Sequence, residues 1–308
     1  MSFQAPDVLV LGGGGVLGEA WMNAVLAGLE EATDFDARKC EGYVGTSAGS
    51  IVAAALAGGL RPDARLGELP EQPASGEDED EEPAGNGSVA TRTLRAGVAT
   101  AVAPVAALAL PTMAPGGAFV RRLALGRVPR GTRSLRGMGS RIDSIGARWD
   151  GRLAVSAVEL ESGRRVMFGR DGAPDASVGE AVEASCAIPG FFHPIAIGGR
   201  TYVDGGAWSP TNMDAASVSR GTQVLCLNPT GSMSHSFTSA MGAIGLASRS
   251  LARLEALVLE RRGARVEIVA PDEGSLEAIG PNLMDPRPRK AVIAAGLTQG
   301  RRLGRRTS

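Results

Sequence analysis

Histidine and cysteine are scarce in this sequence of 308 residues, which contains only His193, His235 and three cysteines. The cysteines are odd in number and follow no repeated spacing, which argues against a disulfide framework and for a reducing compartment. No group of histidine, cysteine and acidic residues shows the spacing of a metal site. We therefore expect a protein that uses neither a metal nor another cofactor.

A long uninterrupted apolar segment is also missing. The most hydrophobic stretch, residues 96–110, contains Pro104 and is followed by Pro111 and Pro115. It is too short and too interrupted for a membrane-spanning helix, which needs about 20 apolar residues. The N-terminus has no basic segment ahead of an apolar one, so a signal peptide is not expected. The sequence thus predicts a cytoplasmic protein with at most a peripheral contact with membranes.

The charges nearly cancel but are unevenly distributed. The formal net charge is −1, and the hydrophobic content of 44% is typical of a globular protein. Residues 68–82 contain eight acids and no base, whereas residues 121–141 contain seven arginines and no acid. Two interpretations stay open: a solvated surface with an acidic spacer, or a body that approaches anionic lipid headgroups. No aromatic side chains are interleaved with these arginines, so nucleic acid is not an expected partner.

The first 60 residues alternate between strand and helix patterns. Residues 7–11 form an apolar run that ends in glycines, as a buried parallel strand does. Residues 16–32 then show the helical spacing of apolar side chains. A second strand leads into the turn at 45–49, and residues 50–60 follow as a helix of small side chains. This order predicts an α/β fold.

The rest of the chain continues this pattern around a large insertion. Residues 61–92 are rich in proline, glycine and acids, which predicts a disordered acidic insertion. Residues 93–148 are predicted to form a helical insertion, first apolar and then arginine-rich, within a single domain that spans residues 1–308. Regular structure then resumes with predicted strands at 153–158, 165–168, 193–197, 201–203, 224–227 and 266–269 and predicted helices at 178–186, 237–262 and 289–302.

A glycine loop between the first strand and helix is the first candidate site. Four consecutive glycines, 12–15, allow backbone amides to converge, and the helix that follows adds partial positive charge. Such a loop can bind a phosphate or an oxyanion. Gly13, Gly15 and Gly18 also match the glycine pattern of dinucleotide-binding folds. However, the acidic residue that those folds need after the second strand is replaced by the turn that contains Ser47.

That turn, Gly45-Thr46-Ser47-Ala48-Gly49, is the second candidate site because it fits the pattern G-x-S-x-G. A serine on a sharp strand-to-helix turn is exposed for attack, and glycines two residues before and after it avoid steric collision. The helix behind the serine favours negative charge nearby. Ser47 is therefore a candidate nucleophile.

The third candidate site is Asp204-Gly205-Gly206, which follows a predicted hairpin. Taken alone, an aspartate before two glycines is most often a turn. A serine nucleophile needs a base, however, and a carboxylate can serve if burial raises its pKa. Two arrangements stay open: a dyad of Ser47 and Asp204, or a triad in which His235 joins them in the chain order of α/β-hydrolases.

These motifs, in this order, resemble the patatin-like phospholipase family. The segment 184–192, Ala-Ser-Cys-Ala-Ile-Pro-Gly-Phe-Phe, also looks like the family's block between the serine and the aspartate. The resemblance covers roughly residues 7–60 and 150–230 and omits the insertion. It implies a three-layer α/β/α sandwich around a mostly parallel sheet, with no metal and no cofactor.

The resemblance also implies roles for individual residues. By the family's pattern, Ser47 would be the nucleophile and Asp204 its base, supported by the turn glycines Gly45, Gly49, Gly205 and Gly206. The amides of Gly13, Gly14 and Gly15 would form the oxyanion hole. The implied reaction is hydrolysis of lipid carboxylic esters through an acyl-enzyme.

The sequence departs from the family at Leu17, where an arginine or lysine is usual. This change puts a preference for phospholipid headgroups in question more than hydrolysis itself. The insertion follows the helix of the serine, so an apolar part of it could cover the site as a lid. A patatin-like protein without catalysis, which serves as a scaffold at a membrane surface, is the alternative to an enzyme.

Overall fold

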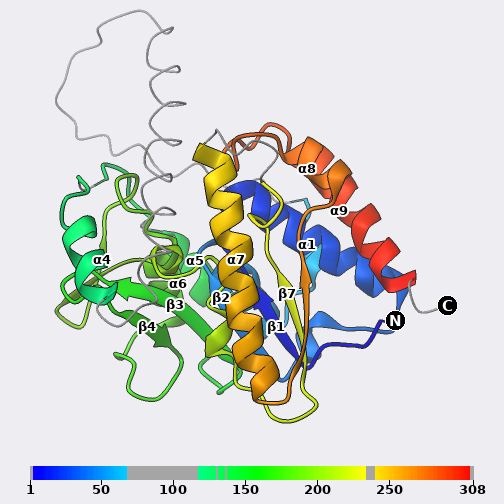
Figure 1. The fold of residues 1–308 in the computed structure, drawn as a ribbon, viewed down its shortest axis with the longest axis horizontal. Helices are drawn as coiled ribbons and strands as arrows, with labels where there is room; N and C mark the ends of the chain where they lie inside the picture. Colours follow the sequence, from blue (N-terminus) through cyan, green and yellow to red (C-terminus); the bar gives the residue numbers. More distant parts are fainter. Residues whose placement is uncertain (1–2, 68–116, 130, 136, 234–239, 306–308) are drawn as a thin grey trace, which may run out of the picture.

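An eight-stranded sheet forms the centre of the molecule (Figure 1). The computed structural model describes residues 3–67, 117–129, 131–135, 137–233 and 240–305. The strands are β1 (Val8–Leu11), β2 (Gly42–Thr46), β3 (Leu153–Glu159), β4 (Arg165–Phe168), β5 (Ile195–Ile197), β6 (Arg200–Asp204), β7 (Gln223–Leu227) and β8 (Arg265–Val269).

The sheet is parallel in one part and antiparallel in the other. Its order is β5-β6-β3-β2-β1-β7-β8, with β4 paired to β3. Strands β3, β2, β1, β7 and β8 run parallel to one another, whereas β4 and β6 run antiparallel to β3 and β5 runs antiparallel to β6. Strands β1, β2 and β3 are buried along their whole length because both faces of the sheet are covered.

Strand β3 determines how two other strands meet. Its middle residues pair with β2 and β4 at once, and its later residues pair with β4 and β6 at once. Because a strand has two edges, β2 and β6 must share the edge opposite β4. Thr46, the last residue of β2, pairs with Ser156, and Asp204, the last residue of β6, pairs with Ala157. The carboxyl ends of β2 and β6 therefore meet head to head.

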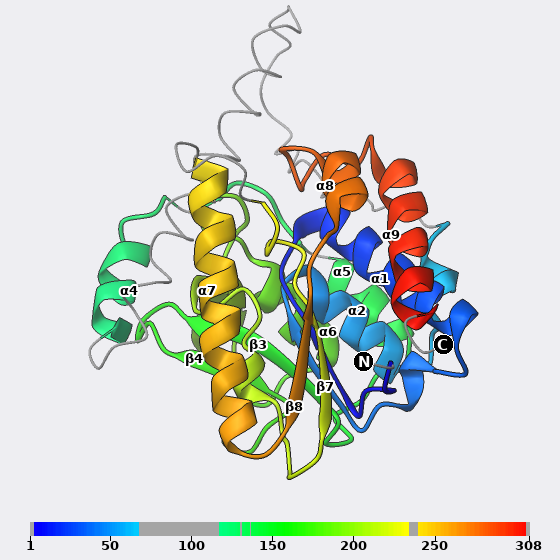
Figure 2. The same cartoon turned by 45° about the vertical axis from the view of Figure 1, so that its right-hand side comes forward.

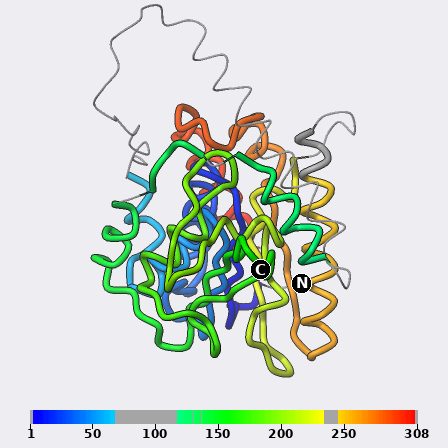
Figure 3. The backbone as a smooth tube through the Cα atoms, turned by 90° about the vertical axis from the view of Figure 1, so that its left-hand side faces the viewer, coloured from blue at the N-terminus to red at the C-terminus, as the bar shows by residue number. Residues whose placement is uncertain are grey.

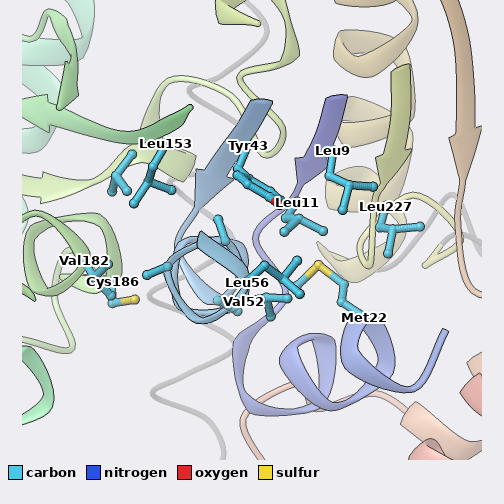
Figure 4. Close-up of a cluster of buried hydrophobic side chains, with 14 of the residues drawn as sticks. Leu9, Leu11, Met22, Tyr43, Val52, Leu56, Leu153, Val182, Cys186 and Leu227 are labelled. Atoms are coloured by element: carbon cyan, nitrogen blue, oxygen red, sulfur yellow. The ribbon is translucent and has the colours of Figure 1, made fainter. Parts of the chain in front are cut away.

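Helices cover both faces of the sheet, which gives three layers (Figures 1 and 2). Successive residues of β1 lie on opposite faces of the sheet: Leu9 and Leu11 belong to one core cluster, and Val8 and Val10 belong to the other. The first cluster contains α1 (Gly15–Ala32), α2 (Ala48–Ala57) and α6 (Val178–Cys186), with α5 (Met138–Ser144) packed on α6. Figure 4 shows this cluster, in which Val52 and Leu56 of α2 lie beneath the strands.

The opposite face is covered by α7 (Ala240–Arg261) and α4 (Gly117–Leu125). Ala252 and Ala256 of α7 pack with Val10, and Leu125 of α4 packs with Val158 and Val203. The tube view, turned by 90°, shows α7 on one side of the molecule (Figure 3). The three-layer α/β/α sandwich predicted from the sequence is thus the observed fold.

Helix α9 (Arg289–Gly304) completes the fold by packing along α1, and α8 (Glu273–Ile279) packs on α9. Glycines allow the backbones of α1 and α9 to approach closely. A Cβ at Gly300 would lie 2.2 Å from the Val25 carbonyl oxygen, and one at Gly28 would lie 2.4 Å from the Leu297 carbonyl oxygen. The Trp21 indole also donates a hydrogen bond to Gln299 Oε1 at 2.9 Å.

The predicted strands and helices after residue 150 are confirmed to within a few residues, including the hairpin whose turn, Gly198-Gly199, has positive φ at both glycines. The predicted acidic insertion begins differently, because residues 62–65 form a short 3-10 helix, η2 (Pro62–Arg65). Residues 68–116, which include the apolar stretch 96–110, lie outside the described residues. Among the helices that are described, none is long and apolar enough to cross a bilayer.

The close approach of α1 and α9 predicts the effect of a single methyl group. We expect Gly300→Ala to lower the free energy of unfolding by about 1–3 kcal/mol, because overpacking forces two helices apart. Urea denaturation followed by circular dichroism measures this change. Gly67→Ala is the control, since a Cβ at Gly67 would meet no atom of the described residues within 4 Å. Equal stability of both variants would contradict this account of the packing.

Candidate active site

Ser47 lies on the turn between β2 and α2 in a backbone conformation that side chains rarely adopt. Its φ is 51° and its ψ is −124°. The neighbouring glycines are required by space as well as by the turn: a Cβ at Gly45 would lie 2.5 Å from Ser50 Cα, and one at Gly49 would lie 1.9 Å from the Leu11 carbonyl oxygen. The pattern G-x-S-x-G is therefore explained by the geometry of this turn.

A residue from the predicted block 184–192 supports the turn. The Ser47 amide donates a hydrogen bond to Ser185 Oγ at 2.9 Å, at the end of α6. The Ser47 carbonyl accepts hydrogen bonds from the amide and the hydroxyl of Ser50 in the first turn of α2. Because Ser47 directly precedes α2, the amino-terminal end of that helix favours negative charge at the serine.

Asp204 ends β6 beside this turn, where its carboxyl group is close enough to the Ser47 hydroxyl for that hydroxyl to lower its pKa. The amide of Gly206 donates a hydrogen bond to Asp204 Oδ1 at 2.7 Å. A Cβ at Gly205 would lie 2.2 Å from Ser156 Oγ, so only glycine fits after the aspartate. The structure thus brings together the serine and the aspartate that the motifs singled out.

The environment of Asp204 suits a base that works near neutral pH. Burial raises the pKa of its carboxyl group to about 6, against the hydrogen bonds from Ser47 and Gly206, which lower it. Asp204 is 5% exposed, and Ser47 is 8% exposed. Above pH 6 the carboxylate is mainly ionised and can accept a proton from the serine hydroxyl.

The glycine loop lies directly over Ser47, since a Cβ at Gly13 would sit 3.5 Å from Ser47 Cβ. The structure differs from the sequence expectation at one of the three amides: the Gly13 amide already donates to the Pro210 carbonyl at 2.8 Å. Among the described residues, the amides of Gly14 and Gly15 have no acceptor. These two amides begin α1 and are free to bind an oxyanion.

Leu17, where the family usually has a basic residue, is fully buried in the core beneath the sheet. Its amide donates to the Leu283 carbonyl at 3.0 Å. In this chain the position therefore serves packing, because a charged side chain could not be accommodated there without a partner.

Of the two histidines, the structure describes only His193. His193 is exposed, and its amide pairs with the Arg133 carbonyl at 2.9 Å. His235 lies outside the described residues. Within the part of the chain that is described, the groups that lower the pKa of the Asp204 carboxyl group are the Ser47 hydroxyl and the Gly206 amide. No group of three potential metal ligands occurs among these residues either.

Sequence reasoning missed Asn212, which connects the turns of the serine and the aspartate. This fully buried side chain donates to the carbonyls of Ser209 and Gly205 at 2.6 and 3.3 Å and to Thr46 Oγ1 at 3.1 Å. Its backbone has a positive φ of 48°. The only local signal was its place eight residues after the aspartate, in a segment with no periodic pattern, and its partners lie far away in the sequence.

Comparisons with known proteins agree with these motifs. The sequence model of the patatin-like phospholipase family matches residues 9–217. A search of curated proteins gives no match.

Solved structures show more distant similarity. VipD from Legionella pneumophila is 15% identical with a TM-score of 0.45, and the match covers 98% of this chain and 67% of that one. The type III effector protein ExoU is 17% identical with a TM-score of 0.40, covering 99% and 54%. ExoU in its heterodimeric complex with SpcU from Pseudomonas aeruginosa is 19% identical with a TM-score of 0.36, covering 99% and 52%. This chain thus spans about two thirds of the first structure and about half of the others.

The contact between Ser47 and Asp204 predicts a pH dependence that can be measured with a fluorophosphonate probe. We expect the rate of Ser47 labelling to rise with pH with a midpoint near 6, because only the ionised Asp204 accepts the serine proton. Asp204→Asn should remove both the rise and most of the labelling, and Ser47→Ala should abolish labelling. A rate that does not change between about pH 5 and 7 would contradict the assignment of Asp204 as the base.

Proposed function

Because the chain belongs to the patatin-like phospholipase family, we propose that it is a serine acyl hydrolase that cleaves carboxylic esters of lipids with a dyad of Ser47 and Asp204. The observation that carries this proposal is that the serine on its strained turn and the aspartate are both buried and lie close enough for the serine hydroxyl to lower the aspartate pKa. It pairs a nucleophile with a base of suitable pKa and leaves unpaired amides beside them.

The first half of the reaction forms an acyl-enzyme. Ser47 Oγ attacks the ester carbonyl carbon while its proton passes to Asp204. The tetrahedral oxyanion accepts hydrogen bonds from the amides of Gly14 and Gly15. The Gly13 amide can join them only when its hydrogen bond to Pro210 opens. The oxyanion then collapses, the carbon–oxygen bond of the ester breaks, and Asp204 returns the proton to the leaving alcohol.

The second half frees the enzyme. Water loses a proton to Asp204 as its oxygen attacks the acyl carbon of the Ser47 ester. The second oxyanion uses the same amides, and collapse returns the proton to Ser47 Oγ and releases the fatty acid. Ser185 keeps the serine turn in position throughout, because it accepts the amide hydrogen of Ser47.

Hydrolysis of p-nitrophenyl esters of increasing acyl length tests this proposal. We expect Ser47→Ala and Asp204→Asn to reduce kcat/KM by about 10³-fold or more, since each removes a group that acts in the transition state. The chain length with the highest kcat/KM would describe the acyl-binding site.

His235→Ala is the matched control, because a dyad tolerates its loss and a triad does not. A large loss of turnover in His235→Ala would show that the enzyme uses the triad and not the dyad. If the folded wild-type protein turns over no ester and is not labelled by fluorophosphonates, the scaffold alternative is correct.

We also propose that α4 makes a peripheral contact with anionic lipid. Phe119, Val120 and Leu123 on this helix are 60%, 46% and 40% exposed, and the exposed Arg122 and Arg127 accompany them. Apolar side chains flanked by arginines suit a surface with hydrocarbon beneath negative headgroups. No acidic residue interrupts the helix.

Helix α4 is held firmly close to the aspartate. Arg121 points inward and is fully buried, with its guanidinium 4.1 Å from the centre of the Trp208 ring. It donates hydrogen bonds to the carbonyls of Gly163 and Ala207 at 2.6 and 3.1 Å. Ala207 lies only three residues after Asp204, so a lipid surface on α4 would be near the dyad.

Vesicle cosedimentation tests this contact. Burial of a large apolar side chain contributes about 1.5 kcal/mol or more, so the double variant Phe119→Ser, Leu123→Ser should bind vesicles with phosphatidylglycerol about tenfold or more weakly. Its hydrolysis of a soluble ester should not change. Leu254→Ser on α7, another exposed leucine, is the control. Unchanged vesicle binding by the double variant would exclude α4 as the lipid-facing helix.

A further inference from the structure

Glu255 of α7 is a fully buried acidic residue that the reaction above does not use. Its Oε2 accepts two hydrogen bonds, from Thr211 Oγ1 at 2.5 Å and from the Met213 amide at 2.9 Å. Its Oε1 is also buried and has no hydrogen-bond partner among the described residues, while the nearby Ser209 hydroxyl acts on the carboxyl group by lowering its pKa. A charged carboxylate with one unsatisfied oxygen is an unfavourable group to bury.

A second carboxyl group, that of Asp214, lies close enough to Glu255 for each of the two groups to shift the pKa of the other. Asp214 is held in its ionised form by Arg165, whose two terminal nitrogens donate to its two oxygens at 2.6 and 2.7 Å. Two carboxyl groups in contact favour a state in which only one is ionised. The remaining proton therefore belongs on Glu255, and on its Oε1, because Oε2 already accepts two hydrogen bonds.

The other groups around Glu255 agree with this protonation. Arg262, after the end of α7, donates to the Asp214 carbonyl at 3.2 Å, and it too lowers the pKa of Asp214. Cys226 of β7 interacts with Glu255, and its own thiol pKa is raised by burial. Burial and the charge of Asp214 together raise the pKa of Glu255 to about 7.

The segment 210–213 connects Glu255 to the active site, because its residues alternate between contacts with Glu255 and contacts with the catalytic loops. Thr211 and Met213 bind Glu255, whereas the residues next to them, Pro210 and Asn212, face the catalytic loops. The Pro210 carbonyl accepts the Gly13 amide, and Asn212 joins Thr46 to the Gly205 carbonyl. Since the backbone between them is continuous, a shift at Thr211 or Met213 moves both contacts.

We propose that Glu255 is a positioning residue that, as a neutral acid donating to Asp214, fixes Pro210 and Asn212 and so aligns the glycine loop with the dyad. The proposal rests on the proposed function, because the alignment matters only if Ser47 and Asp204 react. Ionisation of Glu255 removes the donor to Asp214 and places a second negative charge beside it, so the alignment loosens as pH rises.

The sign of the stability effect follows from the same contacts. The pKa of Glu255 is raised in the folded protein, so the folded state is most favoured at low pH and loses stability as pH rises through about 7. The raised pKa of Asp204 contributes in the same direction. The wild type and a variant of Glu255 both retain Asp204, so the contribution of Asp204 cancels in the difference between their stabilities.

The decisive variant is Glu255→Gln, which keeps an acceptor for Thr211 and Met213 and a donor for Asp214 but cannot ionise. With a soluble p-nitrophenyl ester, we expect its kcat near pH 6.5 to stay within about twofold of wild type. Above pH 7 the wild type should lose kcat, with little change in KM, and Glu255→Gln should not. Glu260→Gln, an exposed acid on the same helix, is the control and should follow the wild type.

Glu255→Ala, which loses both sets of hydrogen bonds, should reduce kcat by about tenfold or more at every pH, because the glycine loop is no longer aligned. The Tm of wild type minus that of Glu255→Gln should fall between pH 5.5 and 8.5. An identical alkaline decrease of kcat and Tm in wild type and Glu255→Gln would overturn the proposal. If no ester is hydrolysed at all, the proposed function fails, while the pH dependence of Tm still tests the proton on Glu255.

Discussion

The edge of β3 that β2 and β6 share is the constraint on which the site depends. One strand arrives parallel to β3 and the other antiparallel, so their last residues, Thr46 and Asp204, pair with consecutive positions, Ser156 and Ala157. Neither strand can extend without colliding with the other. Each chain must turn away at the same point, and the two turns carry the serine and the aspartate.

The sharp turn at Ser47 follows from that constraint and carries a conformational cost. A residue other than glycine with φ of 51° costs about 1–3 kcal/mol, and such strain persists only where the surroundings enforce it. Here Gly45 and Gly49 give the turn room, and Ser185 and Ser50 satisfy its amide and carbonyl. Burial of the β2 strand and the α2 helix in the core offsets the cost.

Buried polar contacts extend from the dyad through the sheet to the opposite face. Asn212 joins the two catalytic turns, and Glu255 anchors the same segment from α7. Arg165 contributes twice, since it binds Asp214 and lies 5.2 Å from the centre of the Trp208 ring, which Arg121 of α4 also contacts. Because buried polar groups must keep their partners, this network links the aspartate turn to the helices on that face.

The sequence by itself determined the elements and the motifs, because hydrophobic spacing and the glycines around Ser47 and Asp204 act over a few residues. It also placed the chain in its family. The tertiary structure decided which distant groups meet: Ser185 lies 138 positions from Ser47, and Glu255 lies 42 from Met213. It also decided that Pro210 occupies the Gly13 amide. Such contacts depend on strand order and on the side of the sheet that a helix covers, and no local pattern encodes either.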